Sequence, residues 1–146
     1  MEKEKLTILI VDDQRINRQI LAGLLRFDYD VLEAENGAEA LEQLEHHEEI
    51  AAILLDLVMP VMDGYEFLRR FKETPYAELP IIAVTGDKDA GTEQKVLDLG
   101  AWDFVSKPYH PATLLTQLKN VIIRSQYYLV SQMKFVYEHD PLTELL

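Results

Sequence analysis

The sequence predicts an α/β protein with a doubly wound parallel sheet, covered by helices on both faces. Five short aliphatic runs alternate with five segments of helical periodicity along the 146 residues. Strands that alternate with helices are joined by crossover connections, which make neighbouring strands parallel. The runs contain few polar residues, as expected of strands buried on both faces. The length suits one domain with an appendage.

The first two strand–helix units are predicted from residue 6 onward. Leu6–Val11 is a continuous aliphatic run and predicts the first strand. The helix after it ends near Arg26 and is marked by Ile16, Ile20, Leu21, Leu24 and Leu25. Val31–Ala34 predicts a short second strand, closed by a turn at Asn36-Gly37. The second helix is marked by Ala40, Leu41 and Leu44.

The third unit has the most distinctive pattern in the chain. The apolar run Ala51–Asp56 ends on a carboxylate, and Asp63-Gly64 stops any continuation of the strand. Asp63 and Glu66 have the spacing of a capping box, so a helix is expected to run from there to about Lys72.

The last two units follow the same alternation. Pro80–Thr85 predicts the fourth strand, and Trp102–Val105 predicts the fifth. On the helix between them, which Gly100 is expected to end, three side chains are predicted to face inward. These are Val96, Leu97 and Leu99. From Pro111 a helical pattern continues beyond the length of an ordinary domain helix, which predicts an extended C-terminal helix.

Residues capable of polar chemistry stand at the strand ends. They are Asp12 and Asp13 after the first strand, Asp56 at the third, Thr85 at the fourth and Lys107 after the fifth. In doubly wound sheets the ligand site lies beyond the carboxyl ends of the strands, where strand order reverses. The flavodoxin-like order 2-1-3-4-5 is the common one for five units, and it would bring the ends of the first and third strands together.

These side chains suit a divalent cation and a tetrahedral anion. Three carboxylates close together repel one another, and each raises the pKa of the others. Mg²⁺ removes that repulsion and prefers carboxylate and carbonyl oxygens as ligands. Lys107 and Thr85 would hold an anion against one carboxylate, and carboxylates are known to accept phosphoryl groups.

The same motifs resemble the receiver domain of bacterial two-component response regulators. The resemblance covers residues 6–123, in order and spacing. It is carried by Asp12-Asp13, by Asp56 with Met59-Pro60-Val61-Met62-Asp63-Gly64, by Thr85-Gly86 and by Lys107-Pro108. It implies a signalling switch phosphorylated by a histidine kinase. Such a domain is not an enzyme, apart from catalysing its own phosphorylation and dephosphorylation.

The resemblance assigns the central roles to carboxylates. Asp56 is implied to accept the phosphoryl group. Asp12, Asp13 and Asp56 are implied to hold Mg²⁺, with the backbone carbonyl of Val58 as a further ligand.

The resemblance also assigns roles around the phosphoryl group. Thr85 would bond to a phosphoryl oxygen, and Lys107 would pair with the same group. The family's bond before the matching proline is typically cis, which makes Lys107–Pro108 a candidate. The family's switch moves the threonine and an aromatic residue inward, here Thr85 and Phe104. Phe104 has no hydroxyl, so we expect it to move by packing alone.

Two further positions tune the lifetime of the phosphoryl group in this family. They correspond to Val58 and Asp87. Valine cannot position an attacking water, whereas Asp87 could position one or repel it. We therefore expect intermediate to slow autodephosphorylation.

The C-terminal segment carries apolar pairs seven residues apart. They are Leu114-Leu115, Val121-Ile122, Tyr128-Leu129 and Phe135-Val136. A seven-residue repeat keeps one face of a long helix toward a partner helix. A receiver needs only the first half of this helix to cover its sheet, so we expect the second half to form a homodimer. Ser125 and Gln132 interrupt the pattern, which predicts a weak pairing or one with a specific register.

The final residues resemble the opening of a diguanylate cyclase (GGDEF) domain. That family typically begins Asp-Pro-Leu-Thr-Gly-Leu, and residues 140–145 match it except that Glu144 replaces the glycine. We therefore expect residues 1–123 to be a receiver domain and residues 124–146 a helical linker toward an output domain. That output would involve cyclic di-GMP.

Composition limits the partners. A formal net charge of −12 argues against binding nucleic acid or anionic membranes, which would repel the chain. The absence of cysteine excludes disulfides and thiolate metal sites. No signal peptide or membrane span fits the sequence, so a cytoplasmic location is expected.

Two other functions fit parts of the sequence. A stand-alone receiver could act as a phosphate shuttle or docking module, but it would not need the seven-residue repeat. A flavin- or nucleotide-binding protein of the same topology would be expected to carry a phosphate-binding loop after the first strand, and none is present.

Overall fold

Five parallel strands form one sheet in the order β2-β1-β3-β4-β5, which confirms the predicted topology. The computed structural model describes residues 5–59, 61–86 and 90–139, with the backbone alone at residue 90 and residues 128–139. The strands are β1 (Leu6–Val11), β2 (Tyr29–Ala34), β3 (Ile50–Asp56), β4 (Ile81–Thr85) and β5 (Asp103–Ser106).

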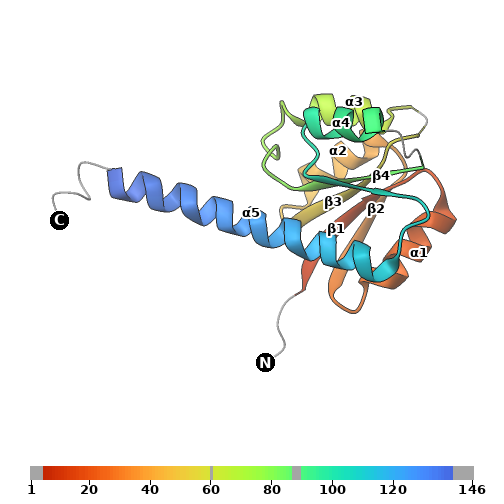
Figure 1. Cartoon of the computed structure of the whole chain (residues 1–146), viewed down its shortest axis with the longest axis horizontal. Coiled ribbons are helices and arrows are strands. Elements are labelled where there is room, and N and C mark those ends of the chain that lie inside the picture. Colours follow the sequence, from red (N-terminus) through yellow and green to blue (C-terminus); the bar gives the residue numbers. More distant parts are fainter. Residues whose placement is uncertain (1–4, 60, 87–89, 140–146) are drawn as a thin grey trace.

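Helices cover both faces of the sheet. They are α1 (Arg15–Leu25), α2 (Gly37–His46), α3 (Gly64–Phe71), α4 (Ala90–Asp98) and α5 (Pro111–His139). The helices α1 and α5 lie on one face, and α2, α3 and α4 lie on the other (Figure 1).

The aliphatic runs are explained by a core on each face. Successive residues of a strand point to opposite sides. In β1, Ile8 and Ile10 pack with α1 and α5, whereas Leu9 and Val11 pack with α2 and α3. All four side chains are at most 1% exposed. A strand covered in this way has no solvent-facing position, so its sequence shows no alternation of apolar and polar residues.

Local signals fix where several helices begin and end. The Asn36 side chain accepts a hydrogen bond from the Glu39 N–H at 2.8 Å, which caps α2. Asp63 accepts one from the Glu66 N–H at 2.9 Å, which caps α3 at the predicted place. Gly100, after α4, has φ of +111°, a conformation that glycine adopts without strain.

The prediction that Leu97 faces inward is wrong. Its side chain is 38% exposed, whereas its neighbour Val96 is completely buried. Adjacent residues of a helix point about 100° apart, so the two side chains lie in different directions. Leu99, beyond the end of α4, is partly buried against the core.

The helix α5 has a buried stripe that stops part of the way along it. Leu114, Leu118, Val121 and Ile122 are at most 5% exposed and pack on the sheet. Ser125 is the last buried residue among the described side chains of α5. Beyond it the helix continues away from the sheet to His139 (Figure 1). Among the described residues, no helix combines the length and apolar character needed to cross a membrane.

Candidate functional site

Three carboxylates meet at the carboxyl edge of the sheet. Val11 and Leu55 are register partners in β1 and β3, so Asp12 and Asp56 follow at equivalent places on neighbouring strands. Ligand oxygens of Asp12, Asp13 and Asp56 all lie within 4.8 Å of one another. The parallel register therefore brings together residues that are more than 40 positions apart in the sequence.

Asp56 is a buried carboxylate at the end of β3. Its exposed fraction is 8%, and burial together with the nearby charge of Asp12 raises its pKa to about 6. The Lys107 ammonium and the Val58 N–H act in the opposite direction, and Asp13 adds a smaller upward effect on the pKa. The Val58 N–H lies 3.4 Å from Asp56 Oδ1. A carboxylate in this setting is stabilised by any cation placed beside it.

Asp12 is held by the loop that follows it. It is 2% exposed, and its Oδ1 accepts a hydrogen bond from the Gln14 N–H at 2.9 Å. Its Oδ2 lies 4.0 Å from the Lys107 ammonium. Asp13, by contrast, is exposed at the rim of the cluster. The cluster therefore combines a fixed, buried carboxylate with one that faces solvent.

The ends of β4 and β5 lie beside this cluster. Thr85 is 4% exposed, and its carbonyl accepts a hydrogen bond from the Lys107 N–H at 2.7 Å. The peptide bond between Lys107 and Pro108 is cis. The structure thus brings Asp12, Asp56, Thr85 and Lys107 to one edge of the sheet.

The loop after Asp56 depends on a glycine. The Gly64 N–H donates to the Leu57 carbonyl at 2.9 Å, which folds the loop back onto the end of β3. A Cβ at residue 64 would lie 2.6 Å from both the Asp56 carbonyl oxygen and the Leu57 Cα. Only glycine allows this approach, which explains the Asp63-Gly64 pair in the sequence.

Three further residues were predicted to act in the switch or in the lifetime of the phosphoryl group, namely Phe104, Val58 and Asp87. Phe104 is half-buried and packs against the core beneath α3 and α4. Its carbonyl accepts a hydrogen bond from Gln117 of α5 at 3.1 Å. Val58 is 79% exposed beside the acidic cluster. Asp87 lies outside the described residues.

Two residues near the cluster were missed by sequence reasoning. Arg18 of α1 is 8% exposed, and its Nη1 donates to the Asp12 carbonyl at 2.8 Å. Tyr109 follows the cis proline. Its burial, and to a lesser extent the charge of Asp12, raises the pKa of its phenol. A charged residue in a helix is ordinarily expected on the surface, so only the folded structure shows that Arg18 is buried.

The acidic cluster fits a hard divalent cation. All the donors are oxygens, and two of the three carboxylates are buried. Adjacent ligands of an octahedral Mg²⁺ ion lie about 3 Å apart and opposite ligands about 4 Å apart, so the oxygens of the cluster, all within 4.8 Å of one another, are spaced close to what one ion requires. Burial, and then the charge of Asp12, raises the pKa of Asp56, so a cation bound beside these carboxylates would favour the ionised form.

A hollow of about 360 Å³ adjoins the cluster between α1 and the start of α5. Asp12 and Lys107 form its polar side, and its apolar lining includes Ile20, Leu24 and Tyr109. Ile16 and Ile20 are 68% and 53% exposed on this part of α1. Apolar side chains exposed next to a polar site are typical of a surface that meets another protein.

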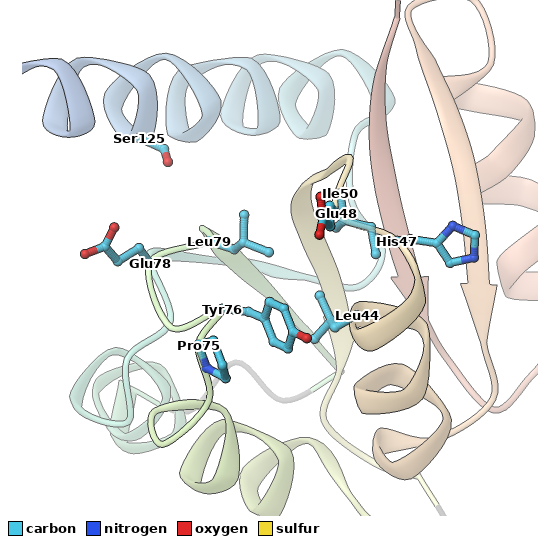
Figure 2. Close-up of a pocket in the computed structure, with 9 residues that line it drawn as sticks. All are labelled: Leu44, His47, Glu48, Ile50, Pro75, Tyr76, Glu78, Leu79 and Ser125. Atoms are coloured by element: carbon cyan, nitrogen blue, oxygen red, sulfur yellow. The ribbon is translucent and has the colours of Figure 1, made fainter.

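Another cavity, of about 210 Å³, lies at the opposite edge of the sheet (Figure 2). It is bounded by the end of α2, the loop before β4 and Ser125 of α5. Leu44 and Ile50 contribute apolar surface, and Glu48 and Glu78 contribute carboxylates. Because Ile50 begins β3 and Asp56 ends it, the full length of that strand separates this cavity from the acidic cluster.

Comparison with known proteins identifies a family. The chain matches the response regulator receiver domain over residues 8–119. A probable cyclic di-GMP phosphodiesterase of Vibrio cholerae is 42% identical over 103 residues, which are 70% of this chain and 23% of that protein. The chain spans about half or less of the first curated relatives it matches.

Solved structures give the same result. A putative response regulator from Chloroflexus aurantiacus has a TM-score of 0.78 and 32% identity, and the match covers 82% of this chain and 99% of that chain. A probable two-component system response regulator/GGDEF domain protein has a TM-score of 0.77 and 31% identity, over 83% of this chain and 50% of the other. Since the family match runs from β1 into α5 and includes every carboxylate of the cluster, the chain belongs to the response regulator receiver domain family.

Proposed function

We propose that this chain is a phosphorylation-dependent switch that accepts a phosphoryl group on Asp56. The donor would be a histidine kinase or a phosphotransfer protein, and Mg²⁺ would be required. The observation that carries the proposal is the meeting of three carboxylates within 4.8 Å, beside the ammonium of Lys107. A buried carboxylate that ends a strand has no packing role, so its place at this edge favours chemistry.

Asp56 would act as the nucleophile. One of its carboxylate oxygens forms a bond to phosphorus while the bond from phosphorus to the donor nitrogen or oxygen breaks, and the electron pair of that bond leaves with the donor. The Lys107 ammonium would pair with the phosphoryl oxygens, and the Thr85 hydroxyl would donate to one of them. Such transfer depends mainly on alignment and on positive charge around the phosphoryl oxygens.

Asp12, Asp13 and Asp56 are the residues that would hold Mg²⁺, with the Val58 carbonyl as a further ligand. The ion would neutralise part of the charge of the carboxylates and of the phosphoryl group. With its Oδ1 fixed by the Gln14 N–H, Asp12 would provide the least mobile ligand.

Incubation with acetyl phosphate and Mg²⁺, followed by intact-mass measurement, tests the acceptor. The wild type is expected to gain the mass of one phosphoryl group, and Asp56→Asn is expected to gain none. Omitting Mg²⁺ should abolish the gain in the wild type. An unchanged wild-type mass with Mg²⁺ present would refute the assignment.

The hollow between α1 and the start of α5 is the surface proposed to meet the donor protein. Asp12 and Lys107 line it together with apolar side chains, so a partner seated there would reach the acidic cluster. Ile20→Glu should slow phosphorylation by a cognate kinase and leave phosphorylation by acetyl phosphate unchanged. Equal loss with both donors would contradict this assignment.

Phe104 is proposed to change its packing on phosphorylation without gaining a hydrogen bond. Its side chain is half-buried in the present state, so it has room to become more buried. Structures with and without a phosphoryl mimic should show two Phe104 rotamers. A single shared rotamer would disprove the switch.

The phosphoryl group is proposed to be lost at an intermediate to slow rate. Val58 is exposed beside Asp56 and has no polar atom on its side chain to orient an attacking water. The second tuning residue, Asp87, lies outside the described part of the chain. A phosphate-release assay should give a lifetime well beyond seconds, and a lifetime of seconds would contradict the prediction.

The output is proposed to be a cyclic di-GMP domain reached through α5, with dimerisation through the second half of that helix. The similarity to a receiver/GGDEF protein and to a probable cyclic di-GMP phosphodiesterase supports this output. The Asp140–Thr143 motif that suggested it lies outside the described residues. The coding sequence that follows this segment in its gene tests the proposal.

A stand-alone receiver remains the second candidate. It is favoured by the similarity to the Chloroflexus aurantiacus response regulator, of which 99% is covered. The continuation of α5 beyond the sheet distinguishes the two, because a stand-alone domain has no use for it.

A further inference from the structure

Arg18 is a buried cation that links the backbone behind the acidic cluster to two carboxylates at the end of β2. Its side chain is 9% exposed, and its Nη1 donates to the Asp12 carbonyl at 2.8 Å. Its Nε donates to Glu33 of β2 at 3.0 Å, and its Nη2 lies 3.7 Å from Glu35. The guanidinium therefore joins α1, the end of β1 and the end of β2.

The bond to the Asp12 carbonyl fixes more than one residue. The Asp12 carbonyl and the Asp13 N–H belong to a single planar peptide. On its other side, the Asp12 N–H donates to the Ala34 carbonyl at 3.1 Å. Hydrogen bonds therefore hold both the N–H and the carbonyl of Asp12, and with the carbonyl they hold the peptide plane that leads into Asp13. Asp13 is exposed, so this backbone restraint helps to set its direction.

Glu33 keeps the guanidinium in place. Planar arginine forms hydrogen bonds in fixed directions, so a contact at Nε orients the Nη1 bond to the Asp12 carbonyl. The Glu33 carbonyl in turn accepts a hydrogen bond from Gln43 of α2 at 3.1 Å. The support of the acidic cluster thus extends across the sheet edge to a second helix.

The influence of Arg18 on the cluster is geometric. The charges that shift the pKa of Asp56 are those of Asp12, Lys107 and Asp13, and Arg18 is not among them. Its guanidinium points to a backbone carbonyl and to the carboxylates of β2 and the residue after it. Removal of its hydrogen bonds should therefore loosen the backbone at Asp12 without directly changing the pKa of Asp56.

We propose that Arg18 is a positioning residue for the divalent cation, which sets the Asp12–Asp13 peptide so that both carboxylates can bind one ion. The inference rests on the proposed function, since it assumes that these carboxylates bind Mg²⁺. Residues that orient metal ligands from behind typically change metal affinity by one to two orders of magnitude when mutated.

Calorimetric titration of the unphosphorylated chain with Mg²⁺ tests this role. Arg18→Met keeps the apolar stem and removes every donor, and it should raise the Mg²⁺ dissociation constant about tenfold. Arg18→Lys should fall between this variant and the wild type. The matched control is Arg26→Met, which removes the same charge from an exposed position at the end of α1 and should bind as the wild type does.

The rate of mass gain from acetyl phosphate provides a second measurement. For Arg18→Met it should need more Mg²⁺ for half-saturation and return close to the wild-type value at saturation. Unchanged Mg²⁺ affinity, with only a lower melting temperature, would show that Arg18 is purely structural and overturn the inference.

Glu33→Gln keeps the test decisive if Arg18→Met does not fold. This variant should raise the Mg²⁺ dissociation constant less than the arginine substitution does. Wild-type affinity in both Arg18→Lys and Glu33→Gln would overturn the inference. If the wild type neither binds Mg²⁺ nor gains phosphoryl mass, the proposed function itself fails.

Discussion

Asp56 is a carboxylate whose ionisation opposes folding. Burial and the charge of Asp12 raise its pKa to about 6 in the folded protein, against about 3.9 in an unfolded chain. Below about pH 4, Asp56 is protonated in both the folded and the unfolded state, so it does not reduce stability. As the pH rises from about 4 through about 6, the unfolded chain loses this proton before the folded protein does, and the free energy of unfolding falls.

Asp56→Asn should stabilise the protein at neutral pH in the absence of divalent cations. We expect the free energy of unfolding to rise by about 1–3 kcal/mol at pH 7.5, because the neutral amide avoids the cost of a buried charge. Urea unfolding from pH 4 to 8 measures the difference, which should vanish near pH 4. A difference that does not vary with pH would contradict the raised pKa.

Added Mg²⁺ should make the wild type more stable than Asp56→Asn, which reverses their order in the absence of the ion. An ion that binds the folded state alone stabilises it according to its concentration and dissociation constant. The melting temperature of the wild type should therefore rise with added Mg²⁺, and that of Asp56→Asn should rise much less. An equal rise in both proteins would indicate that the ion binds elsewhere.

At the scale of an element, the β3–α3 connection holds the acceptor in place through Gly64. The missing Cβ leaves room for the loop to fold back onto the end of β3, because a Cβ at residue 64 would lie only 2.6 Å from the Asp56 carbonyl oxygen and from the Leu57 Cα. Gly64→Ala should lower the free energy of unfolding by about 1–3 kcal/mol, because the loop or the end of β3 must move. It should also slow phosphorylation by acetyl phosphate.

The control for this substitution lies in α1. A Cβ at Gly23 would meet no atom within 4 Å, and the residue lies inside the helix. Gly23→Ala should therefore raise the free energy of unfolding by about 0.5–1 kcal/mol and leave phosphorylation unchanged. If both variants were destabilised equally, close packing at Gly64 would not be the cause.

At the scale of the whole molecule, α5 is longer than its own domain can cover. Its 29 residues extend about 43 Å, and the sheet covers only the first half (Figure 1). An isolated helix of the remaining length is marginally stable in water. The apolar pairs of the sequence continue at residues 128–129 and 135–136, which favours a second copy of this helix as the partner.

If the chain associates through this segment, substitutions there should change association without changing the stability of the receiver. Leu129→Lys combined with Val136→Lys should shift the chain toward monomer in sedimentation experiments and leave the receiver's unfolding midpoint nearly unchanged. The matched control, Gln126→Lys, adds a charge at an exposed position and should associate as the wild type does. A monomeric wild type at high concentration would refute the pairing.

Much of this fold could be predicted because three of its strands, β1, β3 and β4, are almost entirely apolar. Runs such as Leu6–Val11 are covered on both faces, so they show no regular alternation of apolar and polar residues. The edge strand β2 was recognised only from Val31, although it begins at Tyr29, because Asp30 interrupts its apolar residues. Leu97 was misplaced since periodicity alone does not fix which side of a helix packs.

The acidic cluster could be anticipated, but its support could not. Carboxylates at strand ends stand out in a sequence, since parallel strands bring their carboxyl ends to one edge. Arg18 gave no such signal, because its burial depends on Glu33 and on a backbone carbonyl that no side-chain pattern reports.

The sequence by itself determined the class of fold and the residues at the acidic edge, and the strand order was expected only because it is the common one for five units. The fold class and these residues are encoded in local runs and motifs, which retain their meaning without knowledge of the packing. Only the tertiary structure decided that Arg18 is buried behind Asp12, that Leu97 faces outward and that α5 leaves the sheet after Ser125. Each of these depends on contacts between distant segments, which exist only once the strands are aligned in register.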